Sequence, residues 1–310
     1  NPLPGITCYK NIPTLSLEGF HFQLNVTDGS PYMPTVGLET PVNTSDFFGN
    51  VHARRAFAYA LNFTQLLEEA WLNEAEQSAT WHIEGLVPDY RDLSIVPYDI
   101  NISKIEYHLK NANFPEGSLW DTGFHTYLVY PEGHDQRRIA CEIIESAIES
   151  LNASAFIIDV VALPWSDYIT QMVDGLLPCF LIGWLADFAD ADNFVRPYMH
   201  TYGDFSHIQG YSNSTVDAEI DLAIKVPDGP ERRDLYYDLQ RTFISDCPTL
   251  ALAQPYTRYW CRSWVQGWYY NPLATFIPCS DFYTMWKSEP STRYAWPMFH
   301  HDLGHTGYAE

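Results

Sequence analysis

The chain has 310 residues, of which 46% are hydrophobic and 15% aromatic, so it can bury a substantial core in one large or two medium domains. Seventeen Lys and Arg residues stand against 39 Asp and Glu, and the formal charge of −22 repels phosphate backbones and anionic lipid surfaces, so we expect no nucleic-acid partner. No stretch approaches the ~20 apolar residues that a membrane helix needs.

The amino-terminal quarter predicts a strand and two helices. Residues 1–17 are Pro-rich without periodicity, and we expect them to be a connector. Residues 19–25 alternate apolar and polar side chains, the pattern of a half-buried strand. A helix is expected from about Asn50 and a second one after Asn62, so the two form a helical hairpin. Residues 79–97 show little periodicity and predict a loop.

Strands and helices alternate through the middle of the chain. In order, we expect a helix at 102–110, a strand at 124–130, a helix at 135–151, a strand at 156–161, a short helix that Ser166 caps, and a strand at 179–182. This alternation over residues 124–184 predicts a parallel sheet covered by helices. Ligands of such sheets bind outside the carboxyl ends of the strands.

An apolar run ends in an aromatic and acidic cluster at residues 178–194. Asp187 stands beside Trp184 and Phe188, where a poorly solvated carboxylate favours a cationic partner such as an amine. The local residues also fit a plainer interpretation, in which Trp184 belongs to the core and the acids form a solvated turn before a helix.

The last third predicts two helices, at about 216–225 and 231–245, and a strand at 249–254. Aromatic side chains gather between Tyr256 and Tyr270. They are either core at a domain border or an aromatic floor for a ligand.

Cysteines and glycosylation sequons both indicate a location outside the cell. None of the six cysteines belongs to a C-x-x-C pair, so they do not form a zinc or redox motif, and most are expected to be bridged, Cys247 with Cys261 being one pairing to test. The chain has N-x-Ser/Thr sequons, and therefore predicted glycosylation sites, at Asn25, Asn43, Asn62, Asn101, Asn152 and Asn213. Asn62 and Asn101 also stand where helix N-caps belong.

Four segments carry a resemblance to a known family. They are Gly-Trp-Leu-Ala-Asp-Phe-Ala-Asp at 183–190, the helix at 51–62, Tyr98-Asp-Ile-Asn-Ile-Ser-Lys at 98–104 and Leu-Tyr-Tyr-Asp-Leu-Gln-Arg at 235–241. Together they resemble, in the family's order, the family 5 extracellular solute-binding proteins, which are the peptide, oligopeptide and nickel receptors of ABC importers.

The resemblance implies an α/β fold, a class II periplasmic-binding-protein lobe with a mixed sheet and helices on both faces. It assigns residues 18–255 to the large ligand-binding lobe and 256–288 to a return segment of a first lobe whose remainder is absent, so the two-lobed clamp is incomplete. Residues 295–308 resemble the opening strand of a PQQ-like β-propeller, which makes 289–310 a linker and the start of such a domain. We expect no metal at the three histidines of this tail.

The resemblance also implies a binding protein without catalytic residues or cofactor. Asp187 would pair with the amine of a peptide, Trp184 and Phe188 would wall the pocket, and Gln254 and Tyr256 would border it. Leu181 replaces a cationic residue that can meet the ligand carboxylate in the oligopeptide receptors, so sugars and a nickel chelate stay open as ligands.

The partners implied are a peptide or other small molecule, an ABC permease and the missing lobe. The location implied is the cell surface, with a membrane anchor in a part not in this chain. The alternative is a surface scaffold or adhesion module with a degenerate receptor lobe; an enzyme is not expected, since no nucleophile, metalloprotease or phosphate-loop motif occurs.

Overall fold

The computed structural model describes residues 4–271 and 284–288. Its central sheet has the strand order β1-β11-β2-β10, with every neighbouring pair antiparallel and the short β5 paired to β11. Its strands are β1 (Ile6–Pro13), β2 (Ser16–Phe22), β5 (Ala75–Glu76), β10 (Cys179–Leu185) and β11 (Thr249–Arg262).

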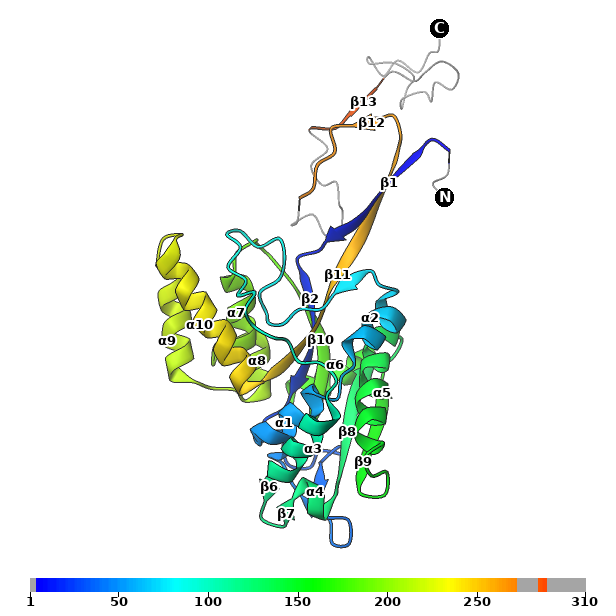
Figure 1. The fold of residues 1–310 in the computed structure, drawn as a ribbon, viewed down its shortest axis with the longest axis vertical. Coiled ribbons are helices and arrows are strands. Elements are labelled where there is room, and N and C mark those ends of the chain that lie inside the picture. The colour runs from blue at the N-terminus through cyan, green and yellow to red at the C-terminus, as the bar shows by residue number, and fades with distance from the viewer. Residues whose placement is uncertain (1–3, 272–283, 289–310) are drawn as a thin grey trace.

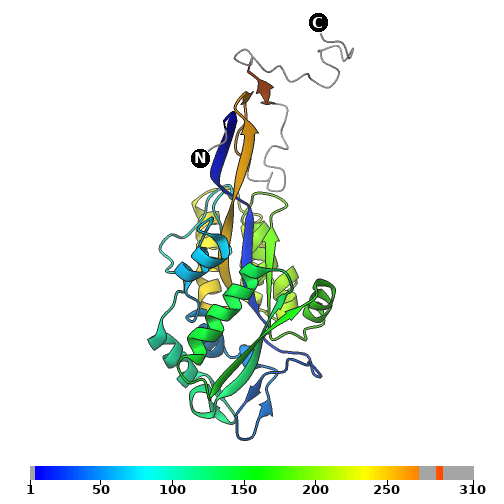
Figure 2. The same ribbon diagram turned by 90° about the vertical axis from the view of Figure 1, so that its right-hand side faces the viewer.

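The first half of β11 is buried beside β2, and its second half leaves the body of the molecule paired with β1. The two strands form a ribbon that projects beyond the helices in both views (Figures 1 and 2). The expectation of a connector without regular structure at residues 1–17 is therefore wrong for β1 and the start of β2. β1 forms because it pairs with β11, a segment some 250 positions away in sequence. The local sequence pattern does not indicate such a distant pairing.

A second sheet has the order β4-β3-β8-β9 and holds the parallel pair. Its strands are β3 (Thr35–Val36), β4 (Val42–Asn43), β8 (Phe124–Pro131) and β9 (Phe156–Leu163). β8 and β9 pair in parallel along their whole length, with α5 (Asp135–Glu149) as the crossover, which confirms the predicted unit. β10 departs from the prediction, because all seven of its residues pair antiparallel with β2 instead.

The predicted helices are observed close to their expected positions, whereas α4, α8, the 3-10 turn and the two short hairpins were not predicted. The helices are α1 (Val51–Ala58), α2 (Phe63–Trp71), α3 (Ile102–Asn111), α4 (Leu119–Thr122), α6 (Trp165–Val173), α7 (Asp192–Met199), α8 (Asp204–Gln209), α9 (Ser214–Ala223) and α10 (Pro230–Asp246), with a 3-10 turn η1 (Phe47–Gly49). Two short hairpins pair β6 (Asn113–Phe114) with β7 (Gly117–Ser118) and β12 (Val265–Gln266) with β13 (Trp286–Lys287).

Asparagine side chains begin four of these helices by accepting a hydrogen bond from the first turn: Asn50, Asn62, Asn101 and Asn213. The prediction that Ser166 caps α6 is wrong. The helix already starts at Trp165 with Pro164 in the cap position.

Two hydrophobic cores lie on opposite faces of the central sheet. On β2, Phe20 and Phe22 point into the core under α1, α2, α3 and α5, and Leu17 points into the core under α6, α7, α9 and α10. This alternation follows from the period of two along a strand. Helices therefore cover both faces; Figure 1 shows α7, α9 and α10 to the left of the central strands and α2 and α5 to the right.

Candidate functional site

The carboxyl end of β10 positions the candidate ligand-binding loop. β10 stays paired with β2 to its last residue, and the chain then turns into the loop that precedes α7. One amide oxygen, Oδ1 of Asn193, accepts hydrogen bonds from Trp184 Nε1 at 3.1 Å and from the Asp187 backbone N–H at 3.0 Å. The Trp184 ring also meets Phe205 edge-on at 5.6 Å. Asn193 thus ties the end of β10 to the backbone of Asp187.

The three acids of this loop have different surroundings. Asp190 accepts from Arg232, whose Nη2 lies 2.9 Å from both carboxylate oxygens, and Asp192 pairs with Arg196 at 3.1 Å. Asp187 is exposed, and its carboxylate makes no ion pair with any residue that the structure describes. Two of the acids thus form ion pairs that hold the loop, and Asp187 has no cationic partner among the described residues.

Arg232 is the anchor of this arrangement. It extends from the first turn of α10, its side chain is 8% exposed, and it also donates to Asp228 at 2.6 Å and to the Ala223 carbonyl at 3.0 Å. Burial lowers the pKa of the Arg232 guanidinium, but hydrogen bonds to Asp228 and Asp190 outweigh it and raise that pKa above its ordinary value. The cation is therefore permanent, and Asp190 is held against it.

A second loop, residues 77–97, lies against the first. The Val87 backbone N–H donates to the Ala189 carbonyl at 2.9 Å, which joins the two loops directly. Gln254, at the middle of β11, accepts from the Glu84 N–H at 2.9 Å and donates to the Glu84 carbonyl at 2.8 Å. The loop is thus tied to both the Asp187 segment and the central sheet.

Gln254 and Tyr256, which were predicted to border the ligand pocket, lie on β11, and the side chain of each forms hydrogen bonds with the protein. Gln254 is buried and also donates to the Thr14 carbonyl at 2.7 Å. Tyr256 is partly exposed and its hydroxyl donates to Glu76 at 2.8 Å. Gln254 therefore holds the neighbouring loop, and Tyr256 is partly exposed with its hydroxyl hydrogen-bonded to β5.

Comparison with known proteins decides the family. Residues 10–206 match the model described as bacterial extracellular solute-binding proteins, family 5 Middle. The chain belongs to this family.

Among curated relatives of this family 5 chain, heme-binding protein A of Haemophilus influenzae is 26% identical over 66% of the chain and 37% of its own length. The glutathione-binding protein GsiB of Pectobacterium atrosepticum is 26% identical over 66% of the chain and 39% of its own length. The chain thus spans about two fifths of the curated relatives it matches.

Solved structures confirm the predicted fold class. The periplasmic binding protein DppA of Helicobacter pylori, solved in complex with a peptide, superposes with a TM-score of 0.69 at 19% identity, over 92% of this chain and 49% of its own. HbpA2 of Haemophilus parasuis gives 0.71 at 18% identity over 92% and 50%. The lobe is therefore the class II periplasmic-binding-protein type of family 5.

Several residues of this family 5 lobe were not identifiable as functional from the sequence. Asn193 and Arg232 hold the candidate loop, yet neither belongs to the motif that was recognised. The spacing of an acid and an arginine some 40 positions apart carries no signal of contact. In the loop at 77–97, Trp81 and His82 are buried, and burial lowers the pKa of His82 to about 4.

The prediction that most cysteines form disulfides is wrong for the cysteines that the structure describes. Cys8, Cys141, Cys179 and Cys247 are free thiols, so the pairing of Cys247 with Cys261 does not occur. Cys141 and Cys179 are fully buried and behave as small apolar core residues, which is a common use of cysteine. Cysteine spacing alone cannot distinguish this use from bridging. Cys279 lies outside the described residues.

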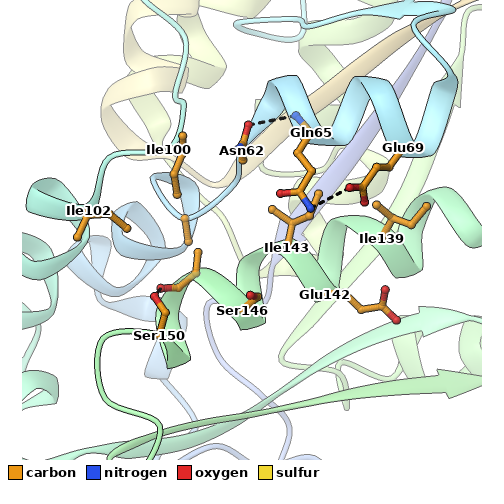
Figure 3. Close-up of a pocket in the computed structure, with 12 residues that line it drawn as sticks. Asn62, Gln65, Glu69, Ile100, Ile102, Ile139, Glu142, Ile143, Ser146 and Ser150 are labelled. Carbon is orange, nitrogen blue, oxygen red and sulfur yellow. Dashed lines mark hydrogen bonds between the residues drawn. The ribbon is translucent and has the colours of Figure 1, made fainter.

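A surface pocket with a volume of about 350 Å³ lies between α2 and α5, and none of the predicted ligand-binding residues lines it (Figure 3). Its floor is apolar, with Ile139 and Ile143 from α5, and its rim carries Glu69 and Glu142. Asn62, one of the predicted glycosylation sites, also lines this pocket while its Oδ1 caps α2. The pocket belongs to the outer helices of the lobe.

Within residues 4–271 and 284–288, no group of three or more metal-ligating side chains occurs, and no helix is long and apolar enough to cross a membrane. The tail histidines and the segment that resembles a propeller strand, residues 295–308, fall outside the described residues.

Proposed function

We propose that this chain is the large ligand-binding lobe of a receptor that delivers peptides to an ABC importer, with Asp187 as the acceptor of the peptide's amine. One observation carries the proposal: Asp187 is the acid of its loop that the described protein leaves without a cation, while Asp190 and Asp192 each have an arginine. A carboxylate held by a fixed backbone and left unpaired is matched by a ligand cation.

The relatives support a small ligand with a free amine. One is a dipeptide-binding protein of Escherichia coli, 24% identical over 73% of this chain, and another is named for glutathione. Trp184 and the exposed Phe188 offer apolar surface on either side of the carboxylate. The site binds and releases its ligand without covalent chemistry, so it needs no catalytic residue or cofactor.

The domain division, the partners, the location and the glycosylation expected from the sequence are also part of this proposal. Residues 18–255 form the large lobe, and the β1–β11 ribbon leads toward a second lobe that 256–288 helps to complete. The permease is the membrane partner, and an anchor outside this chain keeps the receptor at the cell surface. The six sequon asparagines are exposed or partly exposed, as glycosylation requires.

The test compares Asp187→Asn with the parent in a receptor in which this chain is completed by the second lobe. The probes are trialanine and its N-acetylated form, measured by calorimetry. A charged hydrogen bond is worth about 1.5–3 kcal/mol, so Asp187→Asn should weaken trialanine binding by about 10- to 150-fold. The acetylated peptide, which has no amine, should bind both proteins equally weakly.

Asp28→Asn is the matched control, because Asp28 is an exposed carboxylate in the loop that follows β2. It should leave the affinity for trialanine unchanged. Equal affinity of parent and Asp187→Asn for trialanine would refute the assignment of the amine to Asp187. Failure of the parent to bind any peptide would refute the peptide as the ligand.

A further inference from the structure

Two histidines meet on the outer helices of the lobe, on α1 and α3, at a place that the proposed receptor function does not use. His52 Nδ1 and His108 Nδ1 lie 2.9 Å apart. His52 is partly exposed at the start of α1, whereas His108 is 7% exposed near the end of α3. One ring nitrogen of each residue is therefore directed at the other, next to solvent.

The separation of the two nitrogens fits a chelated metal ion. Imidazole nitrogen binds a first-row divalent metal at about 2.0–2.1 Å, and two such bonds at a right angle place the nitrogens about 2.9 Å apart. A right angle is the arrangement of tetragonal and square-planar sites, which suit Cu²⁺ and Ni²⁺. A tetrahedral Zn²⁺ site needs a separation of about 3.3 Å, so the pair would have to open.

We propose that His52 and His108 form a two-histidine binding site for a divalent transition metal, with Cu²⁺ bound more tightly than Ni²⁺ or Zn²⁺ and with water completing the coordination. The metal replaces the hydrogen bond between the rings, and each ring then carries its proton on Nε2. His108 is held in place by stacking on Tyr59, whose ring centroid lies 5.7 Å away at 9°. His52, being partly exposed, is the ring that turns to admit the ion.

The surrounding charges favour neutral rings and set a moderate affinity. Burial lowers the pKa of His108 to about 4, with the charge of His52 adding to the effect, and burial with the nearby Arg55 lowers the pKa of His52. The neutral form of both rings is therefore favoured, and the Nδ1 proton that makes the hydrogen bond between them moves to Nε2 of the same ring when a metal binds. Arg55 and Lys104 repel a dication, but each is held by another partner, Arg55 by the Ser245 carbonyl and Lys104 by the Tyr59 hydroxyl at 3.0 Å.

The experiment uses the whole chain with His300, His301 and His305 replaced by alanine, so that all Cu²⁺ binding is measured without these tail histidines. Calorimetric titration with Cu²⁺ should give one site per chain, and His52→Ala should weaken it at least tenfold. His108→Gln, which keeps most of the side-chain volume, should do the same. His207→Ala is the matched control, since His207 is an exposed histidine on α8, and it should bind Cu²⁺ as the parent does.

Electron paramagnetic resonance of the Cu²⁺ form provides a second readout. Coupling to two imidazole nitrogens is expected in the parent and to at most one in His52→Ala. Unchanged affinity in a folded His52→Ala protein, coupling to a single nitrogen in the parent, or the absence of Cu²⁺ binding would each overturn the proposal.

Discussion

Replacing Arg232 by methionine should destabilise the lobe strongly and loosen the loop that presents Asp187. The side chain of Arg232 is 8% exposed and its Nη2 lies 2.9 Å from both oxygens of Asp190, which is itself 26% exposed. Removing one partner of a buried ion pair costs about 3–5 kcal/mol, because the other charge is left without compensation. Asp190 retains some contact with water, so we expect a loss near the lower end, about 3 kcal/mol.

The measurement is urea unfolding followed by tryptophan fluorescence. With a urea dependence of about 2–3 kcal/mol per molar, the midpoint should fall by about 1–1.5 M. Arg233→Met is the matched control: Arg233 is the next residue of α10, but it is 43% exposed and pairs with an exposed aspartate, so its loss should cost under about 0.5 kcal/mol.

A third variant separates the ion pair from other effects of the substitution. Replacing Asp190 by leucine together with Arg232→Met removes both charges, and it should recover part of the lost stability. A free energy of unfolding for Arg232→Met within 1 kcal/mol of the parent, or an equal loss in Arg233→Met, would refute the view that Arg232 anchors the loop.

Three further changes follow from the described contacts. Asn101→Ala should lower the free energy of unfolding by about 1 kcal/mol in urea, because it removes the cap of α3, whereas Asn101→Ser should restore most of it; equal stability of all three proteins would contradict the cap. Burial lowers the pKa of His21 to about 3 and of His82 to about 4, so the unfolded chain binds protons that the folded chain does not below pH 6.5. Stability should therefore fall from pH 6.5 toward pH 4 by up to about 1.4 kcal/mol per unit for each histidine, and urea midpoints that stay level over this range would argue against it. Burial raises the pKa of Cys179 to about 12 and that of Cys141 well above its ordinary value, so a thiol reagent should modify neither in the native protein and both in denaturant; rapid native labelling would show that these cores open.

The sequence by itself determined the local elements and the family. Helical periodicity placed the starts of α1 and α2 and both ends of α3, α5, α9 and α10 within a few residues of their observed bounds. Asn62 and Asn101 marked helix starts because a cap acts within one turn. The motif at residues 183–190 located the end of a strand and its acidic loop. These features depend on contacts between near neighbours in the chain, so they are readable without a structure.

Only the tertiary structure decided how distant segments pair. β10 pairs antiparallel with β2 and not with the parallel neighbour that was predicted. Residues 6–13 form a strand because they pair with β11. The three acids of the candidate loop look alike in sequence, and the arginines from α7 and α10 distinguish Asp187 from the other two. Strand pairing, ion pairing and the choice between a buried thiol and a disulfide all depend on which residues meet across long chain separations, and local side-chain pattern does not encode those distances.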